Sequence, residues 1–90
     1  MDNIGPGQVV ISKAGRDKGR KFIILKEIDR DYVYIADGCL RKVEKPKKKK
    51  VKHLKFVNIT SNTLKNKIDT NRNVENFEIR SFLKSLEEKN

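Results

Sequence analysis

A basic segment bracketed by glycines, GRDKGRK at positions 15–21, is the part of this sequence best suited to holding a phosphate group. Gly15 and Gly19 let the backbone approach an anion closely and turn its amide hydrogens outward. Lysine beside them acts as a point charge, whereas arginine also forks onto phosphate or stacks on a base. A solvated β-turn explains the glycines taken alone equally well, so the neighbouring cations make this segment a candidate phosphate-binding loop.

Lysines crowd the segment from Lys45 to Lys55, which holds seven of them in eleven residues. Four consecutive lysines repel one another, so this run predicts an extended, mobile loop. About six phosphate contacts from it would make binding steeply salt dependent. The alternative is a solvated loop that only keeps the chain soluble. His53 lies inside the run without a second histidine or a cysteine at ligand spacing, so it is read as a phosphate or ribose contact or a neutral rim residue.

The charge of the whole chain points in the same direction. In 90 residues, 22 lysines and arginines outnumber 12 acidic residues, for a formal net charge of +10. The excess is concentrated in residues 1–57, which hold 16 of the basic residues and 7 of the acidic ones. Such a field attracts polyanions and accelerates their association. Nucleic acid is therefore the leading partner class, with an anionic membrane surface a distant second.

The sequence holds no constellation that indicates an enzyme. Its length fits one small domain without a cofactor-binding cleft. Asp29 and Asp31 flank a turn whose chemistry explains them, and there is no phosphate-loop signature, nucleophile elbow or paired-carboxylate spacing. Cys39, the only cysteine, is expected to be a small, partly buried hairpin residue. We expect no catalytic residue, no metal site and no cofactor.

Short β-rich runs must position these basic segments. Asp37-Gly38 is a strong signal for a two-residue hairpin, which predicts a strand directly after it. The spacing of about ten residues, without an intervening helix, predicts a mainly β fold, a small five-stranded barrel. The expected strands are Gln8–Lys13, Lys21–Ile28, Tyr32–Ala36, Cys39–Val43 and Lys52–Asn58.

The last third of the chain reads differently. Ser61–Ile68 is expected to form a short turn or helix, and Val74–Glu88 an amphipathic helix with Asn73 as its N-cap. So short a helix is unstable alone in water, which places its apolar stripe against an open side of the barrel. We therefore divide the chain into a barrel, residues 1–58, and a polar linker with a C-terminal helix, residues 59–90. The stripe consists of Ile79, Phe82, Leu83 and Leu86.

The stretch GQVVISKAGRDKGRKFIILKEID, followed by YVYIADG, resembles a KOW motif. Residues 7–57 are similar to the KOW-domain large-subunit ribosomal proteins of the "fourteen-e" family and their small bacterial homologues. The matching pieces are GQVV at 7–10, GRDKG at 15–19, DG at 37–38 and KHL at 52–54. The resemblance implies an SH3-like barrel that binds structured RNA, typically ribosomal RNA.

The basic segments and the resemblance to KOW proteins together predict a non-enzymatic RNA-binding module that holds or chaperones ribosomal RNA through phosphate contacts. Tyr32 and Tyr34 share a strand face and are expected in the core or at its rim, so recognition of folded RNA is expected more than base stacking. The expected RNA-binding residues are Lys13, Gly15, Arg16, Lys18, Gly19, Arg20, Lys21, Arg41, Lys42, Lys47, Lys48, Lys49, Lys50, Lys52, His53 and Lys55.

The expected setting is the cytoplasm, in association with the ribosome. Residues 1–7 lack the basic and apolar regions of a signal peptide, and no apolar run is long enough to span a bilayer. We expect a monomer when free, with ribosomal RNA and ribosomal proteins as partners and no membrane. Two alternatives remain open: an SH3-like protein-interaction adaptor that docks through the helical stripe, and a non-specific nucleic-acid binder.

Overall fold

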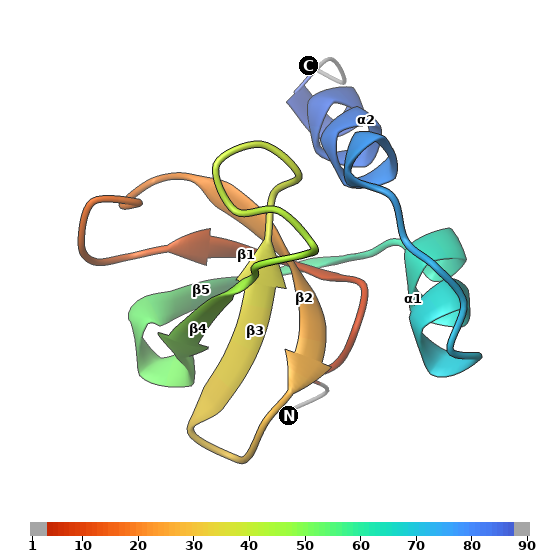
Figure 1. The fold of residues 1–90 in the computed structure, drawn as a ribbon. Helices are drawn as coiled ribbons and strands as arrows, with labels where there is room; N and C mark the ends of the chain where they lie inside the picture. The colour runs from red at the N-terminus through yellow and green to blue at the C-terminus, as the bar shows by residue number, and fades with distance from the viewer. Residues whose placement is uncertain (1–3, 88–90) are drawn as a thin grey trace.

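The computed structural model describes residues 4–87, which form a five-stranded antiparallel sheet and two α-helices (Figure 1). The prediction of a mainly β chain with a C-terminal helix is confirmed. The elements are β1 (Gln8–Ser12), β2 (Lys21–Glu27), β3 (Tyr32–Ala36), β4 (Lys47–Lys50), the 3₁₀ turn η1 (Val51–His53), β5 (Leu54–Thr60), α1 (Asn62–Asp69) and α2 (Asn76–Glu87).

The strands follow the order β4-β3-β2-β1-β5, so the chain returns at its end to pair β5 with β1. No pairing joins β4 to β5 within residues 4–87, and the sheet is therefore open. The η1 turn carries the chain from one edge to the other. The Val51 amide donates to Asp31 O over 2.8 Å, and the Lys13 amide donates to His53 O over 2.8 Å. These two bonds hold η1 against the start of β3 and the end of β1.

Each strand of the central hairpins contributes to two apolar clusters, because successive side chains point to opposite faces of a sheet. On β1, Val9 faces one cluster and its neighbour Val10 faces the other. The cluster enclosed by the sheet itself contains Val10, Phe22, Ile24, Val33, Ile35 and Leu54.

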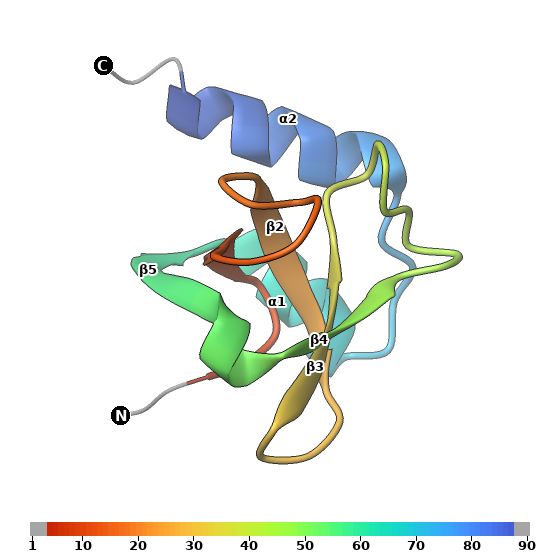
Figure 2. The ribbon, with the colours of Figure 1, turned by 90° about the vertical axis from the view of Figure 1, so that its left-hand side faces the viewer.

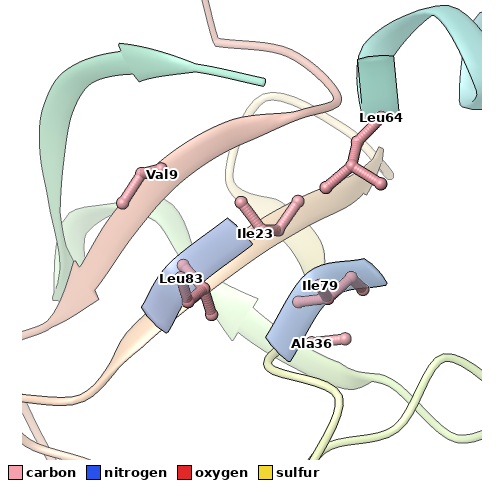
Figure 3. Packing of buried hydrophobic residues seen from close by; sticks show 6 residues of the cluster. All are labelled: Val9, Ile23, Ala36, Leu64, Ile79 and Leu83. Atoms are coloured by element: carbon pink, nitrogen blue, oxygen red, sulfur yellow. The ribbon is translucent and has the colours of Figure 1, made fainter. Parts of the chain in front are cut away.

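The two helices cover the other face of the sheet. Leu64 of α1 and Ile79 and Leu83 of α2 pack against Val9 and Ile23 (Figure 3). The apolar stripe of α2 therefore faces the sheet. This cluster combines side chains from residues 1–58 and from residues 59–90 in one core.

The predicted cap of the second helix is wrong. Asn73 lies before the helix and donates its side-chain amide to Glu75 over 2.9 Å. The helix begins at Asn76, and Glu78 accepts the backbone amide of Glu75 instead, over 2.9 Å. This bond is the half of a capping box in which a glutamate of the first helical turn accepts the amide of the residue before the helix. Residue 88, where the sequence placed the helix end, lies outside the described residues.

The fourth strand is not the predicted Cys39–Val43, but β4, which begins at Lys47. Asp37 does not start a two-residue hairpin. Its Oδ1 atom accepts the amides of Cys39 (2.9 Å) and Arg41 (2.8 Å), while Arg41 O accepts the amide of Asp37 (2.9 Å). These bonds close a turn over residues 37–41, and the strand that pairs with β3 begins only at Lys47. Cys39 is consequently exposed, contrary to prediction.

The lysine run is not a mobile loop, because it forms β4, η1 and the start of β5. Long aliphatic stems let lysine pack in a strand while its ammonium reaches a partner. Lys49 is only 9% exposed, and its Nζ donates to Ala14 O over 3.1 Å. On the opposite face, Lys48 Nζ lies 4.7 Å from the centroid of the Tyr32 ring. Dispersing the charges to both faces of the strand relieves the repulsion that argued for disorder.

Candidate nucleic-acid interface

Two basic loops meet at one end of the sheet, beside α2 (Figure 2). The first loop, residues 13–20, joins β1 to β2, and the second loop, residues 37–46, joins β3 to β4. The two loops are about 20 residues apart along the chain, and side-chain bonds rather than sequence proximity bring them together.

Two carboxylates cross-link the two loops in a reciprocal way. Asp17 of the first loop accepts a bond from Arg41 Nη2 of the second loop at 3.3 Å. Asp37 of the second loop accepts a bond from Arg20 Nη2 of the first loop, also at 3.3 Å. Both aspartates are buried, so these pairs are screened less than exposed ion pairs. Each loop thus holds the other in place through one aspartate and one arginine.

Asp37 is ionised more readily than an ordinary aspartate. Burial raises its pKa, but the amide hydrogens of Arg41 and Cys39 and the Arg20 guanidinium outweigh burial and lower the pKa below its usual value. The carboxylate therefore serves both as the turn-forming acceptor within the second loop and as the partner of the first loop. Sequence analysis missed this anchoring role of Asp17 and Asp37, although an acid within each basic loop was visible.

Strand β4 is tied to the first loop by two lysines. Besides the bond from Lys49 to Ala14, Lys47 Nζ lies 4.0 Å from Asp17 Oδ2. Both lysines pair in register with inward-facing residues of β3, Val33 and Ile35, so they extend from the inner side of the sheet. Four predicted RNA-binding residues, Arg20, Arg41, Lys47 and Lys49, therefore have structural partners within the chain.

The glycines do not turn the amides of the first loop outward as predicted. The amide of Gly19 donates to Ser12 O over 2.8 Å, and the amides of Lys18 and Arg20 donate to Gly15 O and Asp17 O. These three donors are unavailable to an anion. Gly19 is required because its φ is +88°, a backbone conformation that other residues adopt only under strain. Side-chain cations, not these amides, give the loop its capacity to bind anions.

Other predicted residues keep their cations exposed. Within residues 4–87, these side chains show no ion-pair or hydrogen-bond partner, and each is an accessible positive charge. They are Lys13, Arg16, Lys18, Lys42, Lys52 and Lys55. Gly15 and Gly19 are exposed beside them, whereas Lys21 and His53 are half-buried.

The first loop and the start of β5 are neighbours, which places further cations together. The bond from the Lys13 amide to His53 O joins the first loop to η1, and Lys55 pairs with Ile11 in the β1–β5 ladder. Lys55 lies opposite Ile11, and Lys13, the first residue after β1, follows Ile11 by two residues, so the two lysines are near each other. This part of the basic surface is assembled by strand pairing.

The tyrosines do not offer open stacking platforms. Tyr32 and Tyr34 are both half-buried, as expected for residues at the rim of the core. The Tyr32 ring carries Lys48 Nζ at 4.7 Å and Lys50 Nζ at 5.9 Å from its centroid. These lysines occupy the ring by cation–π contact, so a base would have to displace them before stacking.

Within residues 4–87, no group of three or more histidine, cysteine or acidic side chains is arranged to hold a metal ion. The same residues contain no helix that is long and apolar enough to cross a membrane. The chain matches no known family model, and a search of curated proteins finds no match to it.

Proposed function

We propose that this chain is an RNA-binding module of the KOW type, which holds structured RNA, ribosomal RNA foremost, by contacts to the phosphate backbone. The observation that carries the proposal is the reciprocal pairing of Arg20 with Asp37 and of Arg41 with Asp17. It fixes two basic loops at one end of the sheet, while Arg16, Lys18 and other cations have no ion-pair partner among residues 4–87. Charges that are already positioned lose little conformational entropy on binding.

The order and the connections of the strands support the finer proposal of an SH3-like barrel. Pairing of β5 with β1, and a 3₁₀ turn between β4 and β5, curl the sheet toward closure around the Phe22 cluster. The segment GRDKG, which resembles the KOW motif, is the loop between β1 and β2. We propose that this curled sheet is a KOW barrel whose two edges approach each other without pairing.

The arrangement suits phosphate contacts more than base reading. Lysine and arginine side chains that neutralise phosphates release counterions, and the binding constant then falls steeply with salt. Shape-selective recognition of folded RNA follows when such charges are held at fixed spacing on a rigid surface. In the proposed role the chain catalyses no reaction, is monomeric when free, works in the cytoplasm and takes ribosomal RNA and ribosomal proteins as its partners.

The adaptor alternative is less well supported. It needs the stripe of α2 to be free for a partner, but Ile79 and Leu83 are buried in the chain's own core. Large exposed side chains near this region are Leu40 and Phe77, at 62% and 58% exposure. Two isolated apolar side chains do not define a docking surface.

The proposal is tested by comparing the affinities of structured RNA, single-stranded RNA and duplex DNA at several salt concentrations. We expect tightest binding to structured RNA, with a loss of about tenfold or more when Arg16→Gln and Lys18→Gln are combined. The control combines Lys65→Gln with Arg72→Gln, two exposed cations in α1 and in the segment after it (Figure 1). Equal binding to all three polymers, weakened equally by both double variants, would overturn the proposal in favour of non-specific attraction.

A further inference from the structure

A hollow of about 480 Å³ lies where the first loop, the second loop and α2 meet. Its volume is within the range of about 300–1,000 Å³ found for ligand sites. The wall combines segments that are far apart in the sequence, and α2 contributes nearly half of its residues. The lining residues are Gly19, Arg20, Lys21, Asp37, Cys39, Arg80, Leu83, Lys84 and Glu87.

Positive side chains outnumber negative ones in the lining of this hollow. Four cations line it, Arg20, Lys21, Arg80 and Lys84, against the two acids Asp37 and Glu87. Asp37 is already held by the Arg20 guanidinium and by two backbone amides. Lys21 and Lys84 show no ion-pair or side-chain hydrogen-bond partner within the described part of the chain. An anion entering here would meet two positive charges that no side chain of residues 4–87 neutralises.

Arg80 is positioned by the second loop. Its Nη1 donates to Gly38 O over 2.7 Å, which uses one of the five guanidinium donors and leaves the others for a ligand. Gly38 makes this close approach feasible, because a Cβ there would collide with the carbonyl of Asn76 at the start of α2. Helix α2 is thus seated directly on the second loop, which holds Arg80 at the edge of the hollow.

The side of the hollow formed by the first loop is open. Nothing lies within 4 Å of the position where a side chain at Gly19 would begin, so bare backbone borders the space there. Just before Gly19 stand Arg16 and Lys18, both exposed. Exposed cations of the first loop thus directly precede the backbone that borders the hollow, and this succession of positive charges suits a chain of phosphates better than an isolated small anion.

We propose that α2 is a second arm of the nucleic-acid interface, with Arg80, Lys84, Arg20 and Lys21 receiving one backbone phosphate of an RNA whose neighbouring phosphates lie on the first loop. This inference rests on the proposed function and adds two residues, Arg80 and Lys84, that sequence analysis did not single out. Helix α2 then has two roles: one face closes the core, and an adjoining face carries charge to the ligand.

The test compares Lys84→Gln with Lys65→Gln, which removes the same charge from an exposed position on α1. We expect Lys84→Gln to weaken binding of structured RNA about three- to tenfold at moderate salt. The slope of log K against log salt should fall by less than about 0.7–0.9, the value for one whole phosphate contact, because Arg80, Arg20 and Lys21 remain at the same phosphate. Parallel slopes and equal affinities for the two variants would overturn the proposal. The proposed function is tested separately by the Arg16→Gln, Lys18→Gln variant. If that variant loses affinity while Lys84→Gln does not, the role of α2 is refuted and the proposed function stands.

Cys39 gives an independent readout, because it is the only cysteine, is exposed and lines the hollow. We expect saturating structured RNA to slow alkylation of its thiol by a neutral maleimide by roughly fivefold or more, because bound RNA would keep the reagent away from the thiol. Inorganic phosphate and a nucleoside monophosphate, added at millimolar concentration, are expected to leave the rate unchanged. Protection by these small anions, with no protection by RNA, would overturn the proposal and identify a small-anion site instead.

Discussion

Arg41 of the second loop donates to Asp17 of the first loop across 3.3 Å, and this contact defines the geometry of the basic end of the molecule. Together with the reciprocal pair of Arg20 and Asp37, it makes the position of each loop depend on the position of the other. Some of the cations that suggested RNA binding are therefore structural, and they hold the remaining ones in position.

The Asp37 carboxylate should make the protein less stable in acid. Its pKa is lowered in the folded state, so the stabilisation it provides is complete above its ordinary pKa of 3.8 and is lost as the pH falls through the lower folded value. Asp37→Ala should cost about 1–3 kcal/mol at pH 7, because two amides and Arg20 lose their acceptor. Urea denaturation at pH 7 and at stepwise lower pH measures both effects.

The matched control for this experiment is Asp69→Ala, which removes an exposed carboxylate paired with Lys65 on α1. An exposed pair of this kind contributes about 0–1 kcal/mol. The difference in the free energy of unfolding between Asp37→Ala and the wild type should shrink toward zero as the pH is lowered. A deficit that persists unchanged below the folded pKa would show that the carboxylate charge is not what stabilises the loop.

The buried lysine should anchor the first loop to β4. Lys49→Met keeps the aliphatic stem but removes the donor to Ala14 O, and we expect a cost of about 0.5–1.5 kcal/mol. Hydrogen exchange of the Lys18 and Gly19 amides should accelerate, since these bonds close the loop that Lys49 supports. In Lys48→Met, where the lysine is exposed, loop exchange should stay at the wild-type rate. Identical exchange in both variants would contradict the anchoring role.

Two glycines with positive φ should differ in their tolerance of alanine. At Gly19 the space for a methyl group is open, so Gly19→Ala should cost only the conformational strain, about 1–2 kcal/mol. At Gly38 the same change adds a collision with the backbone of Asn76, so it should cost more and displace the start of α2. Denaturation midpoints and amide chemical shifts of residues 76–80 would reveal the difference. Equal costs would argue against close seating of α2 on the second loop.

The helical stripe should behave as core. Ile79→Ala should destabilise the protein by about 2–5 kcal/mol, whereas Phe77→Ala, at a mostly exposed position, should change stability by no more than about 0.5 kcal/mol. Urea denaturation of the two variants measures this directly. A small effect of Ile79→Ala would mean that the stripe is available to a partner, and would revive the adaptor alternative.

Alternation of apolar residues was enough to predict the strands that build the core. Tyr32–Ala36 was predicted with its observed bounds, and the first, second and last strands were placed within two residues of their ends. The helix over 76–87 was found from the spacing of Ile79 and Leu83, since a period of 3.6 residues cannot be satisfied by a strand.

The fourth strand was missed because its stabilising contacts are long-range. Nothing local in KKKK predicts a strand. It forms by pairing with β3, and the contacts of Lys49 with Ala14 and of Lys48 with Tyr32 favour it. The hairpin signal at Asp37 failed for the opposite reason. Its side chain bonds to amides of its own loop and so forms a wider turn than the two-residue type.

The sequence was enough to predict which residues make up the candidate site, but not which of its cations pair within the chain. Sequence identified the basic loops, yet it could not distinguish paired cations such as Arg41 from unpaired ones such as Lys18, because pairing depends on loops that meet only in the folded chain. The cations of α2 escaped notice because residues 58–90 carry almost no net charge. Only the docking of α2 places Arg80 and Lys84 beside the first loop.

The salt dependence of binding to a structured RNA tests the central claim most directly. The wild type is compared with the Arg16→Gln, Lys18→Gln double variant and with the Lys65→Gln, Arg72→Gln control. We expect the slope of log K against log salt to fall by about 1.4–1.8 in the loop variant, the amount for two lost phosphate contacts, and to stay unchanged in the control. Equal slopes for all three proteins would contradict the claim that the first loop holds the RNA backbone.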